Sequence, residues 1–574
     1  MKPNAAALLL AGLGLCLSAP AFADISTAPA GNGWPQFLHQ FQEAYFAANP
    51  AFAVSQGRHE YDGRLPDWSA AGICKEAGWL DRERKATLAF KDAALTPEQR
   101  FERQYLLARI DGDLFWLTEA DEPFHNPAFY LDGGLEPSIY LTRPYASPEK
   151  RLKAFIGYLK AVPVAAAQIR ENLKTPLAKT FVDRGIDAFD GYARFFPGDA
   201  VTAFAEVKDA KLQAELKTAA AAAAKSMQDL ADWFKSQQAT ADNSSFVLGG
   251  KRFADMLWAT ERVNTPLPEL KAIGETDLAR NTAALKDACT QFAPGAAMTD
   301  CVAKMNADKP QGGAVEGARA QLGELRQFIL DHQLVGIPGT EAALVNEAPA
   351  YQRWNFAYID IAGPYDKGMP STYYIAPPDP TWSKADQDAY VPGKAVLLFT
   401  SSHEVWPGHF LQFLHANRSP FQFGQIFVCY AYAEGWAHYS EEMMWEAGLG
   451  DGAAETHIGQ LSEALLRDVR FLCAIGMHTE GMSVQSCETM FREQAYQDPG
   501  SARQQAARGT FDPAYLNYTM GKLMIRKLRS DWTATRGGRD GWGAFHDQFL
   551  SYGGPPIPLV RQQMMGEKDP GALF

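Results

Sequence analysis

The residues whose types and spacing most clearly suggest a chemical role lie in the segment HEVWPGH, residues 403–409. It is the H-E-x-x-H pattern of zinc-binding helices with two residues added between the histidines. On a regular helix, side chains at i and i+4 share a face, whereas those at i and i+6 differ by about 240° and point apart. Pro407 cannot donate a backbone hydrogen bond to the His403 carbonyl, and Gly408 can adopt backbone angles closed to other residues. We therefore expect a bulge that returns His409 to the face of His403.

A second group of metal-binding side chains begins 25 residues after His409. Glu434, His438 and Glu441 stand at i, i+4 and i+7 in the run YAEGWAHYSEE, so they share one helical face. We predict that Glu434 is the third metal ligand beside the two histidines. His438 is the competing ligand from the same helix, and Glu441 is expected to orient a ligand histidine.

This set of residues predicts hydrolytic chemistry. Two imidazoles and one carboxylate leave a fourth tetrahedral position open for water, which is the arrangement of catalytic zinc. We predict one zinc ion per chain, with Glu404 accepting the proton of the water. Tyr518 is a candidate for stabilising the oxyanion, and its alternative role is that of a packed aromatic residue. His478 is a candidate donor above the metal, and its alternative role is that of a core histidine.

Amphipathic helices are expected to position these residues. Apolar residues recur at intervals of three to four in several stretches, which predicts helices over Gln36 to Phe46, Pro97 to Leu114, Arg151 to Leu173, Lys217 to Gln237 and Val315 to His332. Aromatic and branched residues in Tyr351 to Ile359 and Ser371 to Ile375, separated by glycines and prolines, predict a small β hairpin. Lys522 and Arg526, on a later helix, are expected to be solvated; the alternative is that one of them pairs with the terminal carboxylate of a peptide.

The segment Gly336-Ile337-Pro338-Gly339 interrupts the helical pattern and divides the chain. The predicted organisation is a signal peptide over residues 1–23, an N-terminal helical lobe over 24–335, and a catalytic helical lobe with a small β element over 336–574. The fold class is therefore mainly α, with the lobes forming one continuous unit.

Composition excludes several classes of protein. The 574 residues include 47 % hydrophobic and 21 % charged side chains and carry a formal net charge of −13, as expected for a folded globular chain. No cluster of Lys or Arg provides the basic surface that binds a phosphate backbone, so nucleic acid is not an expected partner.

The N-terminus has the features of a signal peptide. Lys2 precedes an apolar stretch from Ala5 to Leu17, and Ala21-Phe22-Ala23 fits a cleavage site before Asp24. The alternatives are a buried N-terminal helix and lipidation at Cys16, although Leu15 is bulkier than the residue that lipoprotein processing prefers. A periplasmic or secreted protein with no integral membrane segment after cleavage is expected.

Six cysteines remain after signal cleavage, an even number in an exported chain. The close spacing of Cys289 with Cys301, and of Cys473 with Cys487, suggests two disulfides. Cys429 lies in an apolar stretch and is expected to be a buried free thiol.

These motifs together resemble the DUF885 family of bacterial proteins, whose pattern is H-E-x-x-P-G-H-x-x-Q. The resemblance rests on HEVWPGH followed by Gln412, on the EGWAHYSEE run, on Gly476-Met477-His478 and Tyr518 to Lys522, and on Gly57 to Asp62 near the N-terminus. Ala474 stands where many members have aspartate. The family looks like a distant relative of helical zinc peptidases typified by thimet oligopeptidase and angiotensin-converting enzyme. That likeness implies two lobes that close over a deep central channel, zinc bound by His403, His409 and Glu434, and Glu404 as the base.

The expected function is an exported zinc peptidase that hydrolyses short peptides. The alternatives are a non-catalytic periplasmic metal-binding or scaffold protein, and an amidase acting on non-peptide or isopeptide bonds. The intact Glu404 beside the ligands favours an enzyme. Cleavage at the amino end, at the carboxyl end or internally is compatible with the motif, as is any oligomeric state.

Overall fold

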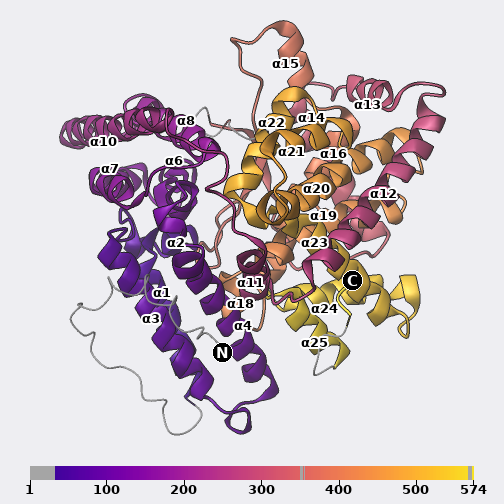
Figure 1. Cartoon of the computed structure of the whole chain (residues 1–574), viewed down its shortest axis with the longest axis horizontal. Helices are drawn as coiled ribbons and strands as arrows, with labels where there is room; N and C mark the ends of the chain where they lie inside the picture. Colours follow the sequence, from indigo (N-terminus) through magenta and orange to yellow (C-terminus); the bar gives the residue numbers. More distant parts are fainter. Residues whose placement is uncertain (1–32, 350–352, 354–355, 567–571) are drawn as a thin grey trace, which may run out of the picture.

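The computed structural model describes residues 33–349, 353, 356–566 and 572–574 of the chain. The predicted signal peptide and its cleavage site lie outside these residues. The helices within residues 34–237, indigo to magenta, gather on one side of the molecule, and most of the later helices, rose through orange to yellow, gather on the other (Figure 1).

The first half of the described chain is helical throughout. Its α-helices are α1 (Trp34–Ala48), α2 (Pro50–Ser55), α3 (Ala70–Ala89), α4 (Pro97–Leu114), α5 (Ala128–Tyr130), α6 (Ser138–Thr142), α7 (Pro148–Asn172), α8 (Lys179–Phe195), α9 (Asp199–Thr202), α10 (Ala210–Gln237), α11 (Gly250–Glu261), α12 (Leu267–Phe292), α13 (Met298–Ala307) and α14 (Ala314–Asp331). All five helices predicted from apolar spacing are confirmed. α4, for example, begins after Thr96, whose hydroxyl accepts from the Gln99 backbone while the Gln99 side chain accepts from the Thr96 backbone.

The second half contains the helices that carry the candidate site. These are α15 (Lys384–Tyr390), α16 (Lys394–Glu404), α17 (His409–Ala416), α18 (Gln422–Ile426), α19 (Tyr430–Glu446), α20 (Ala454–Thr479), α21 (Val484–Glu493), α22 (Pro499–Phe511), α23 (Asn517–Thr533), α24 (Trp542–Ser551) and α25 (Ile557–Met565). α20 packs against α12 and α16, and α19 packs against α23 and α16. The fold is mainly α, as predicted.

A small sheet separates the two halves. Its strand order is β1 (Leu344–Glu347), β3 (Thr372–Ile375) and β2 (Ala357–Asp360). β2 and β3 are antiparallel, with Tyr358 opposite Tyr374, so the predicted hairpin is confirmed for the part that the structure describes. β1 pairs with β3 in parallel and was not predicted, because its Leu-Val-Asn-Glu sequence lacks an alternating apolar pattern.

Buried apolar side chains form three large clusters. The largest joins α11 to α14 with the sheet and the later helices. A second lies among α7, α8 and α10, and a third joins α1, α3 and α4 to Phe423 and Phe427 near α18. The division of the chain at residue 335 stays a prediction.

Among the described helices, α7 alone has the length and hydropathy of a membrane span. Half of that apolar window is buried inside the protein. Leu152, Phe155 and Leu159 of this helix belong to the cluster shared with α8 and α10, and this packing accounts for its apolar character.

Two disulfides join the cysteines whose spacing suggested them. Cys289 is bonded to Cys301, and Cys473 to Cys487. Cys429 is a free thiol, as predicted, although its side chain is only partly buried.

Candidate metal centre

The two motif histidines lie on either side of a helix break. α16 ends at Glu404 and α17 begins at His409. Between them, the Trp406–Pro407 peptide is cis, and the Gly408 amide donates to the Ser402 carbonyl at 2.9 Å. The His403 and His409 rings are nearly perpendicular, edge to face, with their centroids 4.8 Å apart. The predicted interruption between Glu404 and His409 is therefore confirmed, and it takes the form of two separate helices.

Gly408 is required by close packing of the backbone. Its φ of −71° lies outside the left-handed region that favours glycine. A Cβ at this position would lie 1.7 Å from the His403 carbonyl oxygen and 2.5 Å from that of Ser402. The turn can fold this tightly only because residue 408 has no side chain.

The break is tied to the helix that carries the third candidate ligand. The indole nitrogen of Trp436, on α19, donates to the Pro407 carbonyl at 2.8 Å. Trp436 is fully buried, so this contact fixes the distance between the turn and α19.

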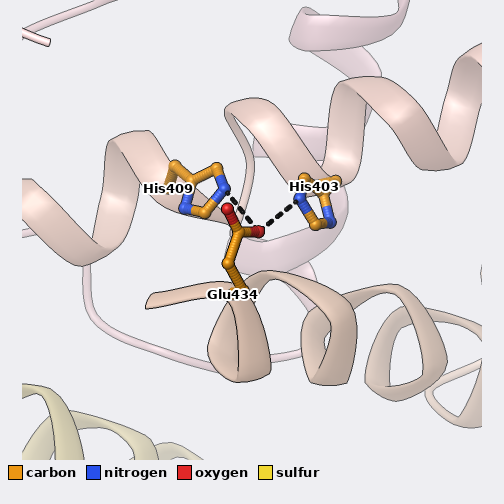
Figure 2. Close-up of side chains that lie close together, drawn as sticks. All are labelled: His403, His409 and Glu434. Carbon is orange, nitrogen blue, oxygen red and sulfur yellow. Dashed lines mark ion pairs between the residues drawn. The ribbon is translucent and has the colours of Figure 1, made fainter. Parts of the chain in front are cut away.

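Glu434 reaches from α19 to both histidines (Figure 2). Its Oε2 lies 3.2 Å from the Nε2 of His403 and 3.3 Å from the Nε2 of His409. These three residues form a group whose ligand atoms all lie within 4.8 Å of one another. The structure therefore brings together the three ligands predicted from the sequence.

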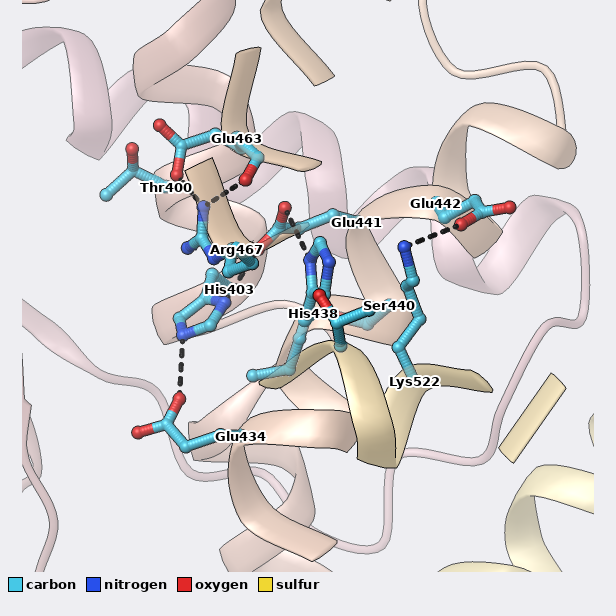
Figure 3. A network of polar contacts seen from close by, with 12 residues as sticks. Thr400, His403, Glu434, His438, Ser440, Glu441, Glu442, Glu463, Arg467 and Lys522 are labelled. Atoms are coloured by element: carbon cyan, nitrogen blue, oxygen red, sulfur yellow. Dashed lines mark hydrogen bonds and ion pairs between the residues drawn. The ribbon is translucent and has the colours of Figure 1, made fainter. Parts of the chain in front are cut away.

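Glu441 fixes the orientation of the His403 ring. Its Oε1 lies 2.7 Å from the His403 Nδ1, and Arg467 from α20 contacts the same oxygen at 3.3 Å. Both Glu441 and Arg467 are buried, and Arg467 also pairs with Glu463 (Figure 3). If Nδ1 donates its proton to Glu441, the Nε2 of His403 presents its lone pair to Glu434.

Three acceptor atoms then converge on one point, which requires a positive charge there. The Oε2 of Glu434 is buried and has no hydrogen bond of good geometry. Burial alone would lower the pKa of His403, but the Glu434 and Glu441 carboxylates raise it to about 9. Burial opposes ionisation of Glu434 as well, yet His409 and His403 hold its pKa well below its usual range. Protons supply the positive charge in the metal-free chain, and a cation held by the same atoms would replace them.

His438 does not compete with Glu434 for this position. Its side chain is fully buried, and its Nδ1 contacts the Glu441 Oε2 at 3.3 Å. Burial, together with the nearby charge of Lys522, lowers the pKa of His438 to about 4. The neutral imidazole therefore contacts Glu441, the carboxylate that orients His403, and does not face the metal position.

Glu404 lies beside the histidines with its carboxylate uncommitted. Among the described residues, none makes a hydrogen bond or ion pair with it. Burial raises the pKa of Glu404, while the charges of His409 and His403 oppose that shift. Tyr373 from β3 is close enough that Glu404 contributes to the raised pKa of its phenol, so the small sheet borders the site.

Tyr518, on α23, also lies at the site. Its ring stacks on His403, with the centroids 6.1 Å apart. Burial and the charge of Glu434 raise the pKa of Tyr518, so its hydroxyl stays protonated and can donate a hydrogen bond. The structure therefore brings Tyr518 to the three candidate ligands.

His478 lies elsewhere. Its Nε2 contacts the Gly509 carbonyl at 2.7 Å, and its ring packs against Phe246 and Phe253. It stands 11 positions after Arg467, the α20 residue that contacts Glu441, which is about 16 Å further along the helix axis. Burial lowers the pKa of His478 to about 4. These contacts are those of a core histidine, and the predicted donor role above the metal has no support in its position.

Sequence reasoning missed the arginines on α20. Arg467 and Arg470 interrupt the apolar run from Leu465 to Ile475, and charged residues inside such a run are a signal of buried ion pairs. Lys522 was also misjudged, because it is fully buried beside Asp277 rather than solvated.

A cavity of about 360 Å³ is lined in part by Tyr430. Its walls include Arg109 and Asp113 of α4 as well as Tyr430 and Asp512. The Tyr430 ring in turn contacts Tyr518, with the centroids 5.9 Å apart. Space therefore exists between the early helices and the helices of the candidate metal centre.

A family model matches most of the chain. The model is described as "Bacterial protein of unknown function (DUF885)" and matches residues 50–564. No functionally curated protein matches the chain.

Solved structures share the fold over nearly the whole chain. One, from Shewanella oneidensis, is described as a candidate lipoprotein of unknown function; it is 22% identical, with a TM-score of 0.74. Another, from Colwellia psychrerythraea, is a crystal structure described as a candidate lipoprotein; it is 16% identical, with a TM-score of 0.78. Each similarity covers 93% of this chain and 99% of the other. At these identities the likeness shows a common fold.

Proposed function

This chain belongs to the DUF885 family, and from the geometry of its candidate metal centre we propose that it is an exported zinc-dependent peptidase acting on short peptides. The proposal extends to a two-lobed arrangement with an internal channel, as in the helical zinc peptidases that the motifs resemble. The cavity between the early helices and Tyr430 supports a channel that leads to the site.

The observation that carries the proposal is the position of Glu434 between the two histidines. In a tetrahedral zinc site with bonds of ~2.0–2.1 Å, neighbouring ligand atoms lie about 3.3–3.4 Å apart. The distances from the Glu434 Oε2 to the Nε2 atoms of His403 and His409 are 3.2 and 3.3 Å. Two imidazoles and one carboxylate are also the ligand types of catalytic zinc.

The surrounding residues have distinct roles in the proposed reaction. Zinc bound by His403, His409 and Glu434 would supply Lewis-acid chemistry. Glu404 accepts a proton from the attacking water and delivers it to the leaving amine. The Tyr518 hydroxyl donates a hydrogen bond to the oxyanion that develops on the scissile carbonyl.

Export is part of the proposal. The N-terminal sequence has a positive residue, an apolar stretch and a small-residue cleavage site. The description of the two fold neighbours as lipoproteins agrees with a location outside the cytoplasm. Disulfides between Cys289 and Cys301 and between Cys473 and Cys487 suit an oxidising compartment.

Glu404→Gln tests the proposal. The amide has nearly the same shape as the carboxylate but cannot accept the proton, so peptide hydrolysis should fall by about 10²–10⁴-fold while zinc content and thermal midpoint stay unchanged. Activity is measured by mass spectrometry on a mixed-peptide digest. Glu324→Gln, an exposed site on α14, is the matched control and should retain full activity.

Unchanged hydrolysis by the Glu404→Gln protein would remove Glu404 from the reaction. A zinc-loaded wild-type protein that cleaves none of the peptides would favour the non-catalytic metal-binding alternative.

A further inference from the structure

Three arginines surround the ring of Tyr518 beside the candidate metal centre. The guanidinium carbons of Arg467, Arg470 and Arg508 lie 5.9, 4.8 and 5.8 Å from the ring centroid. Arg467 and Arg470 come from one face of α20, and Arg508 comes from α22. Positive charge is therefore concentrated on the side of the site formed by Tyr518.

Two of the three charges are balanced by carboxylates. Arg467 pairs with Glu441 and Glu463. Arg508 pairs with Asp512 at 2.9 Å and also donates to the Tyr430 hydroxyl at 2.9 Å. These two arginines are therefore held by groups within the protein.

Arg470 has no such partner. Its Nε donates to the Gln505 side chain at 2.8 Å, and no carboxylate among the described residues lies within 4.0 Å of its guanidinium nitrogens. The residue is only 7% exposed. Burial and the neighbouring charges of Arg508 and Arg467 lower the pKa of Arg470, while the hydroxyls of Tyr518 and Tyr430 oppose that shift. An unpaired buried charge is costly and calls for an anionic ligand.

We propose that Arg470 binds a carboxylate of the substrate, and that this carboxylate is the C-terminus of the peptide. The inference rests on the proposed peptidase function. The ring of Tyr518 contacts both His403 and Arg470, and an extended residue spans only ~3.3–3.6 Å. A carboxylate held by Arg470 therefore lies within a few residues of the bond at the metal centre, which makes short peptides cleaved near their carboxyl end the substrate class.

Equilibrium binding tests this inference without requiring turnover. The zinc-loaded Glu404→Gln protein is titrated calorimetrically with N-acetyl-trialanine as the free acid, with its C-terminal amide, and with an N-acetylated Ala-Glu-Ala amide. The same titrations are made with two double variants, in which Arg470→Met or Arg470→Lys is combined with Glu404→Gln. Arg503→Met, at an exposed position on the neighbouring helix α22, is the matched control.

The free acid should bind about 10-fold to 100-fold more tightly than the amide, as expected for a charge-assisted hydrogen bond. Arg470→Met should bring this ratio close to one, Arg470→Lys should keep part of it, and Arg503→Met should leave it unchanged. Circular dichroism and zinc content show whether each variant is folded. If the methionine variant is not folded, the lysine variant still tests the proposal.

Equal affinity for acid and amide in the parent protein, or a preference that survives Arg470→Met, would overturn the proposal. Tight, Arg470-dependent binding of the glutamate-containing amide would support the carboxylate site and assign it to an acidic side chain instead of the C-terminus. Failure of the peptidase function has a different signature, because missing zinc or absent hydrolysis by the wild-type protein leaves the ratio of binding constants unaffected.

Discussion

His403 is constrained at both ring nitrogens by carboxylates of α19. Glu434 faces its Nε2, and Glu441 lies 2.7 Å from its Nδ1. Arg467 holds Glu441 in turn, so the orientation of the imidazole is set by buried side chains that would never touch a substrate.

Glu441→Gln tests this arrangement at the residue scale. The amide cannot stabilise the ring as strongly as the carboxylate, so zinc affinity should fall by about 10–100-fold with the fold retained. Affinity is measured by competition with a chelator of known strength. Glu463→Gln is the control, since Glu463 also pairs with Arg467 but has no contact with His403. Equal losses in the two variants would contradict the orienting role of Glu441.

At the residue scale, the sequence was informative where the partners share one helix or one motif. Glu434 and Glu441 were predicted because their spacing places both on one face of α19. Arg470 was not, because its significance depends on Tyr518 from α23 and on the absence of a nearby carboxylate, which only the packing of helices determines.

The break between α16 and α17 is the element that makes the site possible. A continuous helix would direct His403 and His409 to different sides. The Pro-Gly sequence predicted the break, but the close approach of Gly408 to the carbonyls of Ser402 and His403 depends on the path of the turn and could be seen only in the structure.

Gly408→Ala should weaken zinc binding more than it lowers the stability of the folded protein. An added Cβ would overlap the His403 carbonyl oxygen, so the turn must open and move His409 away from Glu434. We expect zinc affinity to fall by more than about tenfold, because one of the three ligands is displaced. The thermal midpoint of the metal-free protein should change much less. Isothermal titration with zinc measures the affinity, and a thermal melt in the presence of a chelator measures the midpoint of the metal-free protein.

Gly323→Ala on α14 is the matched control, because a Cβ there meets no atom within 4 Å. If Gly408→Ala binds zinc as the wild type does, the turn geometry is not what brings the histidines together.

At the scale of the whole molecule, a buried ionic network ties together the helices behind the site. Lys522 of α23 is fully buried and lies 2.5 Å from Asp277 of α12, 3.7 Å from Glu442 of α19 and 3.9 Å from Asp468 of α20. The helical fold itself was predictable from apolar spacing, whereas this network was not, since its members are more than 200 residues apart at the extremes.

Lys522→Met should strongly destabilise the protein. Asp277 and Glu442 keep Arg280, but among the described residues Lys522 is the cation that Asp468 contacts, and removing one partner of a buried ion pair costs about 3–5 kcal/mol. Lys527→Met on the same helix removes a partly exposed pair with Asp531 and should cost no more than about 1 kcal/mol. Chemical denaturation followed by circular dichroism compares the two. Similar midpoints for both variants would show that the network does not hold the helices together.

The most direct test of the central claim is the zinc content of the purified mature protein and of its His403→Ala and His409→Ala variants, measured by inductively coupled plasma mass spectrometry after dialysis. The wild type should hold about one zinc ion per chain, and each variant should lose it, because the three-ligand set is incomplete without either imidazole. Folded variants that retain a full equivalent of zinc, or a wild type that takes up none from zinc-containing buffer, would contradict the assignment of His403, His409 and Glu434 as a metal centre.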